Sequence, residues 1–179
     1  MCRNELNLQR EDQALDDGIA RMGEVVFSNQ SMPVLRALGL GSCIGLCVLD
    51  PVLKLGCIAH IMLPESRSSK ASTAPAKFAD TTVEYIANEM RAKGAVKSRL
   101  RSAIVGGAQL FSFGEANERL DVGRRNAEVV KRMLKKAGIK LVAEDIGGSK
   151  GRTVILNTIT GEVLVKQAGT QEYCLAKLS

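Results

Sequence analysis

The sequence predicts a single-domain, layered sandwich of the α/β (α+β) class, in which mixed or antiparallel β-sheets are flanked by about two main helices. Short apolar runs broken by glycine and proline indicate several buried strands. Two longer stretches carry apolar residues at helical spacing. The length of 179 residues suits one domain that buries a substantial core.

Strands are expected wherever a short apolar run lies between turn residues. Residues 1–20 are polar and predict a mobile N-terminal extension, a globular domain follows over 21–168, and 169–179 are expected to form a C-terminal tail. Asp50-Pro51 predicts a turn between two of the strands. The predicted strands are residues 34–40, 44–49, 55–63, 100–105, 139–143, 153–156 and 163–166, the last four with approximate ends.

Two helices are predicted from apolar residues that recur on one face. The first begins at about Asp80 and ends at Gly94, because glycine readily adopts the left-handed conformation that ends helices. The second covers about 124–137 and stops at Gly138. Their apolar faces consist of Val83, Ile86, Ala87 and Met90 in the first helix and of Val129, Val130, Met133 and Leu134 in the second.

Composition narrows the classes of function. No apolar run approaches the roughly 20 residues of a membrane span, and no basic start leads into a signal-peptide core, so we expect a cytoplasmic protein without membrane insertion. The net charge of +6 favours an acidic partner surface. With four Phe, two Tyr and no Trp, few side chains can stack on bases, and nucleic acid is not an expected partner.

The segment ALGLGSCIGLC, residues 37–47, crowds three glycines around a cysteine. This pattern indicates a special turn or a close approach of another molecule to the backbone. A phosphate-binding loop is disfavoured, because the spacing G-x-G-x-x-x-G is one residue longer than the dinucleotide fingerprint and a strand follows instead of a helix. Two interpretations of this segment remain: a metal site, or a turn that carries a cysteine nucleophile.

A metal site would use Cys43, Cys47, Cys57 and His60, which read C-x3-C and C-x2-H. Cys57 and His60 lie three residues apart in a predicted strand, so their side chains should point to opposite faces. We therefore expect no metal and no cofactor, with Cys47 and Cys57 as buried thiols. An odd total of five cysteines also argues against a disulfide framework.

A cysteine nucleophile fits this segment better. His60 is the only histidine, and a turn of residues 50–53 would place it directly opposite Cys43, with Cβ atoms about 4.5 to 5.5 Å apart. An adjacent imidazole is the usual means of activating a thiol, and a glycine turn can present backbone N–H groups to an oxyanion. A structural thiol and a buried histidine stay open as the alternative. The residues expected to support the turn are Gly41, Ser42 and Ile44.

The segment LGLGSCIGLCVLDPVLKLGCIAHIMLPES resembles the chemoreceptor glutamine deamidases of bacterial chemotaxis, the CheD family, in which a Gly-Ser-Cys turn is followed by Ala-His and Met-Leu-Pro. Later segments resemble later blocks of the same family, and the resemblance runs from about Gly23 to Lys166. Collinear agreement over this length is far more specific than any single motif. The later segments are KFADTTVEYIANEM, IVGGAQLF, DVGRRNAEVVKRMLKKAGI and AEDIGGSKGRTVILNTITGEVLVK.

The resemblance implies a substrate and three site positions. The family converts selected glutamines in the cytoplasmic helices of methyl-accepting chemotaxis receptors to glutamates, and in some organisms it pairs with a CheC-type phosphatase. Its nucleophile falls on Cys43 and its histidine on His60. Its third catalytic group, a threonine six residues before the cysteine, falls on Ala37, which lacks the hydroxyl. The family fold, a layered α/β sandwich distantly like cysteine-dependent toxin deamidases, agrees with the predicted elements.

A thioester mechanism follows from the two carried-over residues. Cys43 as thiolate attacks the glutamine carboxamide, and His60 protonates the departing ammonia and then activates water. The polar loop at 65–78 is a candidate substrate contact. Because Ala37 departs from the family pattern, the alternative is a non-catalytic docking module that binds chemoreceptors or a CheC-type phosphatase.

Overall fold

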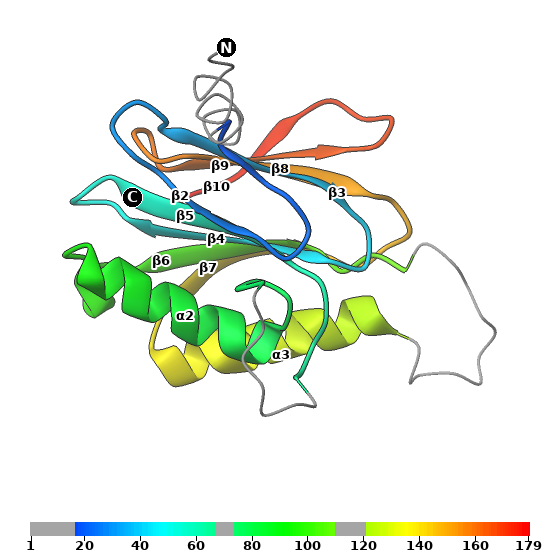
Figure 1. Ribbon diagram of the computed structural model, residues 1–179. Coiled ribbons are helices and arrows are strands. Elements are labelled where there is room, and N and C mark those ends of the chain that lie inside the picture. Colours follow the sequence, from blue (N-terminus) through cyan, green and yellow to red (C-terminus); the bar gives the residue numbers. More distant parts are fainter. Residues whose placement is uncertain (1–16, 67–73, 110–120) are drawn as a thin grey trace, which may run out of the picture.

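The computed structural model of the chain describes residues 17–66, 74–109 and 121–179. Two five-stranded sheets, here called sheet A and sheet B, lie on top of one another, and two helices cover the outer face of sheet B (Figure 1). The layers therefore follow the order sheet A, sheet B, helices. This arrangement confirms the layered α/β (α+β) sandwich that the sequence predicts.

Both sheets are mixed, since each contains one parallel pair, β1 with β3 and β6 with β7, among antiparallel pairs. Sheet A has the strand order β1-β3-β8-β9-β10, and sheet B has the order β2-β5-β4-β6-β7. The strands of sheet A are β1 Ile19–Ala20, β3 Val34–Leu40, β8 Arg152–Asn157, β9 Glu162–Gln167 and β10 Tyr173–Lys177. The strands of sheet B are β2 Val25–Phe27, β4 Ile44–Asp50, β5 Leu55–Ile61, β6 Arg101–Gly106 and β7 Lys140–Ile146.

The helices are α2 Ala79–Ala92 and α3 Val122–Ala137, and a short 3-10 turn, η2 Lys97–Arg99, precedes β6. Gly94 and Gly138 follow the two helices with φ of +92° and +68°, so both predicted helix ends are confirmed. The Asp121 carboxylate accepts a hydrogen bond from the backbone N–H of Arg124 and thereby caps the start of α3.

Strand β4 lies in the middle of the molecule and contributes to two hydrophobic cores. All seven of its residues are buried, and their side chains alternate between its two faces. Ile44, Leu46 and Val48 pack under the helices, whereas Cys47 and Leu49 pack between the sheets. A strand buried on both faces reads as a continuous apolar run, which is why the sequence reveals it so clearly.

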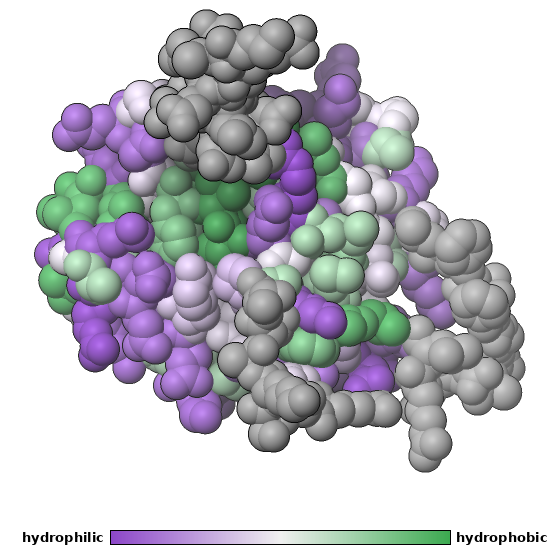
Figure 2. All heavy atoms as spheres, viewed as in Figure 1, coloured by the Kyte–Doolittle hydropathy of each residue, from purple (hydrophilic) through white to green (hydrophobic). Residues whose placement is uncertain are grey.

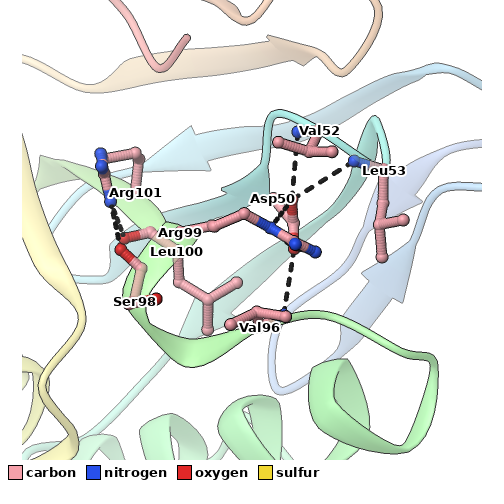
Figure 3. Close-up of polar contacts among 8 residues, drawn as sticks. All are labelled: Asp50, Val52, Leu53, Val96, Ser98, Arg99, Leu100 and Arg101. Atoms are coloured by element: carbon pink, nitrogen blue, oxygen red, sulfur yellow. Dashed lines mark hydrogen bonds and ion pairs between the residues drawn. The ribbon is translucent and has the colours of Figure 1, made fainter.

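A buried carboxylate organises the turn between β4 and β5. Asp50 is fully buried and accepts hydrogen bonds from the backbone N–H groups of Val52, Leu53 and Val96 (Figure 3). Arg99 pairs with the same carboxylate at 2.8 Å. Burial alone would raise the pKa of Asp50, but the Arg99 and backbone hydrogen bonds outweigh it and hold this pKa below its ordinary value.

This turn is longer than the sequence predicts, and one expectation is wrong as a result. Asp50 pairs with Leu55 across residues 51–54, so the residue opposite His60 is Gly45. Cys43 therefore does not lie directly opposite His60. The reason is physical: the Asp50 side chain accepts the N–H groups that would otherwise close a shorter turn.

Two strands lie in segments where the sequence predicts an extension or a tail. β1 lies within residues 1–20 and pairs with β3, and β10 lies within 169–179 and pairs with β9. β1 is only two residues long, and β10, Y-C-L-A-K, is short and largely exposed, so neither strand has the long buried run by which the sequence predicts the other strands. Residues 1–16 of the expected extension and 67–73 of the expected loop lie outside the described residues.

Figure 2 shows the hydropathy of the surface in the same view. The surface over α2 is mostly hydrophilic, and hydrophobic residues gather above it, over the sheets. The outer face of α2 is thus a solvated surface, which agrees with its amphipathic sequence. Within the described residues, no helix is both long enough and apolar enough to span a membrane.

Candidate active site

The candidate nucleophile lies where the chain passes from sheet A to sheet B. β3 ends at Leu40 after an irregularity in its pairing, where Gly39 adopts a φ of +66°. Residues 41–43 then form the turn that leads into β4. A Cβ atom on Gly45 would lie 2.7 Å from Cγ1 of Val154, so the sheets approach too closely here for any larger residue. The glycines of this segment thus serve a turn and a close contact between layers.

Neighbouring segments hold all three carbonyl groups of this turn. The loop at 107–108 donates to the carbonyl oxygens of Gly41 and Cys43 at 2.7 and 2.8 Å, and the Asn126 side chain donates to that of Ser42 at 2.9 Å. The C=O and N–H groups of a trans peptide point in opposite directions, so the N–H groups of Ser42 and Cys43 face away from these anchors. Among the described residues, neither N–H group donates a hydrogen bond.

His60 lies near the end of β5, with its imidazole in the layer between the sheets. Nδ1 is 3.3 Å from the carbonyl oxygen of Ala20. A carbonyl oxygen can only accept, so Nδ1 carries the proton and Nε2 keeps a lone pair. Nε2 is buried and has no partner within the described parts of the chain. Burial lowers the pKa of His60, so the ring is a neutral base at pH 7.

Cys43 and His60 share one face of sheet B. Cys43 precedes Gly45 by two residues, and Gly45 lies opposite His60, so the two side chains are diagonal neighbours at a Cβ separation of about 7 to 8 Å. The Cys43 side chain packs against the core between the sheets. Burial raises the pKa of this half-buried thiol. The resting pair is therefore a neutral thiol and a neutral imidazole.

Ala37 also lies in this layer. It is fully buried in β3 and pairs with Ala20 of β1 and Val154 of β8. The carbonyl oxygen of Ala20 is the partner of the His60 ring, so position 37 lies beside the strand that holds the imidazole. The fold thus brings position 37 into the neighbourhood of His60.

The other expected site residues separate into two groups. Gly41 and Ser42 lie in the turn, whereas Ile44 is the first residue of β4 and its side chain packs under the helices. Cys47 faces sheet A, and Cys57 faces the helices, on the side opposite His60. Within the described ranges, no three His, Cys, Asp or Glu residues form a cluster that could hold a metal ion.

Comparisons with known proteins show the family of this chain. Residues 62–167 match the family described as CheD chemotactic sensory transduction. A probable chemoreceptor glutamine deamidase CheD of Syntrophomonas wolfei is 44% identical over 155 residues, which are 86% of this chain and 96% of that protein. The chain belongs to the CheD family.

Other CheD proteins have a similar level of sequence identity to this chain. The probable chemoreceptor glutamine deamidases CheD of Desulforamulus reducens and Clostridium botulinum are each 43% identical, over 76% and 85% of this chain and 82% and 91% of those proteins. The hypothetical protein YfiH of Bacillus licheniformis is a solved structure with a TM-score of 0.44 and 14% identity, covering 70% of this chain and 50% of that one. At that level of similarity no functional argument follows.

Three residues within the CheD match contact the Cys43 turn, and the sequence did not predict them as site residues. A Cβ on Gly106 would lie 2.3 Å from the Cys43 carbonyl oxygen. A Cβ on Gly107 would lie 2.9 Å from the carbonyl oxygen of Gly123 at the start of α3. Asn126 is the third. The sequence feature that could have revealed Asn126 is its position as a polar residue on the apolar face of the second predicted helix.

Proposed function

We propose that this chain is a protein-glutamine deamidase that converts selected glutamines of chemotaxis receptors to glutamates, with Cys43 as nucleophile and His60 as general base and acid. One observation carries the proposal. His60, the only histidine of the sequence, has a buried Nε2 with no partner among the described residues, on the face of sheet B that it shares with Cys43. The names of the CheD relatives supply the substrate class.

The reaction begins from the neutral pair. The Cys43 sulfur attacks the carbon of the glutamine carboxamide, and the thiol proton passes to Nε2 of His60. The carbonyl oxygen becomes an oxyanion, which the N–H groups of Ser42 and Cys43 would stabilise; this role is supported by the lack of any other acceptor for them among the described residues. His60 then gives its proton to the leaving nitrogen, ammonia departs, and a thioester remains.

Hydrolysis of the thioester completes the cycle. His60 takes a proton from water as the hydroxide attacks the thioester carbon, and the sulfur of Cys43 leaves and recovers the proton. The product is glutamate, and the enzyme returns to its starting state. The proposed mechanism requires no metal or cofactor, because the thiol and imidazole supply the nucleophile, acid and base.

A macromolecular substrate suits the position of the thiol. Cys43 and His60 line neither the groove of about 520 Å³ between α2 and α3 nor the groove of about 690 Å³ beside the start of α3. Small-molecule sites usually occupy such grooves, whereas a receptor helix presents its glutamine at the surface. The proposed substrates are the cytoplasmic helices of chemotaxis receptors, which places the enzyme in the cytoplasm. A CheC-type phosphatase is the proposed further partner.

Mass spectrometry of receptor fragments tests the proposal. The protein is incubated with a receptor cytoplasmic fragment, and glutamine-to-glutamate conversion is followed by the mass increase at each peptide. Conversion by the wild type and by Cys47→Ala, together with none by Cys43→Ala, is the expected result. Full conversion by Cys43→Ala would remove Cys43 from the mechanism. No conversion by the wild type on several fragments would favour a docking module that binds receptors without modifying them.

A further inference from the structure

Asn126 connects the two halves of the candidate active site. It is fully buried in α3, and its Nδ2 donates to the carbonyl oxygen of Ser42 at 2.9 Å and to that of Met62 at 3.0 Å. Ser42 directly precedes Cys43, and Met62 follows His60 by two residues. A single amide group therefore ties the turn of the nucleophile to the strand of the base.

The bond to Ser42 fixes one particular peptide group. The carbonyl of Ser42 and the N–H of Cys43 belong to the same planar peptide and point in opposite directions. Holding the carbonyl toward α3 therefore aims the Cys43 N–H at the other side, where an oxyanion would form. The loop at 107–108 donates hydrogen bonds to the carbonyl groups of the two neighbouring peptides, those of Gly41 and Cys43. The Ser42 carbonyl between them is held by Asn126 instead.

The oxygen of the same side chain points to a role beyond packing. Oδ1 of Asn126 is buried without a hydrogen-bond partner among the described residues. A buried acceptor without a partner costs stability, so the amide is an unfavourable choice as a simple core residue. Its two donated hydrogen bonds, both to backbone beside the reacting pair, are the contribution that offsets this cost.

We propose that Asn126 is a positioning residue of the deamidation reaction, which holds the 42–43 peptide so that the Cys43 N–H faces the oxyanion and keeps the turn in register with the His60 strand. This inference rests on the proposed function of Cys43 and His60. Asn126 does not touch the substrate and acts only through the backbone that it holds.

Asn126→Asp is the sharpest test, because a carboxyl group has almost the same shape and, whether protonated or ionised, cannot donate to both carbonyl groups that the amide holds. We expect kcat to fall about 10²-fold, the scale of a displaced catalytic group, while KM changes less than about threefold. Asn126→Ala should behave similarly. Ser102→Ala is the matched control. Ser102 is equally buried, and its hydroxyl donates a hydrogen bond to the Lys140 carbonyl oxygen at 3.0 Å. It lies near the start of β6, whereas Gly106, which contacts the Cys43 turn, is at the end of that strand. The control variant should lose stability but keep kcat.

Backbone amide resonances provide a readout that does not depend on activity. In Asn126→Asp the Ser42, Cys43 and Met62 amides should shift while those of β9 stay in place. Unchanged turn resonances, or shifted resonances with wild-type kcat, would overturn the positioning role. A wild type with no deamidase activity would mean that the proposed function has failed, and the resonances would still decide whether Asn126 holds the turn.

Discussion

The chemistry of Cys43 and His60 is governed by burial. Burial raises the pKa of the thiol and lowers that of the imidazole, so the free enzyme holds no thiolate-imidazolium pair at neutral pH. The sequence alone had favoured a thiolate as the attacking species. In the proposed mechanism, proton transfer from sulfur to Nε2 therefore accompanies the attack on the substrate.

The pH profile of kcat/KM should reflect His60. Its pKa lies below the ordinary 6.5, so the neutral base persists as the pH falls past 6.5, and activity should be lost only as the pH falls through this lowered value. His60→Asn should lower kcat/KM at least about 10²-fold and remove this acidic limb. Initial rates between pH 4.5 and 8 measure both. An acidic limb above pH 6.5 would contradict the buried, neutral imidazole.

A substitution at position 37 tests whether the hydroxyl group that Ala37 lacks would contribute to catalysis. Ala37→Thr should raise kcat/KM about threefold to tenfold, the value of one hydrogen bond of about 0.5 to 1.5 kcal/mol made in the transition state. Ala37→Val is the matched control, because valine has the shape of threonine without the hydroxyl. Because Ala37 is fully buried, both variants should lose about 1 kcal/mol or more from overpacking. Equal kcat/KM in the two variants would remove position 37 from catalysis.

The register of the β4–β5 hairpin sets the position of His60 relative to Cys43. Its turn length sets the register of the two strands, and a change of one residue would move His60 to the other face of sheet B. The buried Asp50 carboxylate holds this turn through three backbone N–H groups and Arg99. The relative position of the proposed base and nucleophile thus depends on an ion pair at the opposite end of the hairpin.

Asp50→Asn should destabilise the fold by about 3 kcal/mol at pH 7, since it leaves the Arg99 charge without its partner. The pKa of Asp50 lies below 3.8, so its stabilising contribution is present above about pH 4 and is lost as the pH falls through the folded-state value. Urea unfolding of wild type and variant at pH 3 to 7 measures this, and the gap should narrow at low pH. Glu144→Gln is the control, because its ion pair with Lys131 is exposed and should contribute less than about 1 kcal/mol.

The C-terminal end of the described chain packs into the core between the two sheets. Leu178 follows β10, is fully buried in the core between the sheets, and donates its backbone N–H to the carbonyl oxygen of Gly161. A segment expected to be a tail therefore fills part of the interface between sheet A and sheet B. The core that positions the site extends to the second-last residue of the chain.

Leu178→Ala should lower the free energy of unfolding by about 2 to 5 kcal/mol, as for other fully buried leucines. Ile159→Ala is the control, since this residue of the β8–β9 turn is 53% exposed and should change stability by less than about 0.5 kcal/mol. Thermal unfolding followed by circular dichroism compares them. A loss below about 1 kcal/mol for Leu178→Ala would show that the last residues do not support the sandwich.

The sequence by itself determined the elements that have a strong local signal. Strand β4 is an apolar run because both of its faces are buried, and α2 and α3 show apolar stripes that end at glycines. The glycines around Cys43 and the single histidine marked the candidate pair, since these residue types are chemically distinctive wherever they occur. Resemblance to CheD proteins then supplied the substrate class.

Only the tertiary structure decided how these parts meet. The length of the β4–β5 turn depends on Asp50 accepting N–H groups from residues up to 46 positions away, which no local periodicity reports. The tautomer of His60 depends on a carbonyl in β1, a strand of two residues. The anchoring of the 42–43 peptide depends on Asn126, 84 residues from Ser42. Periodicity records which faces are buried, whereas the partner of each buried polar group is fixed only when distant segments pack together.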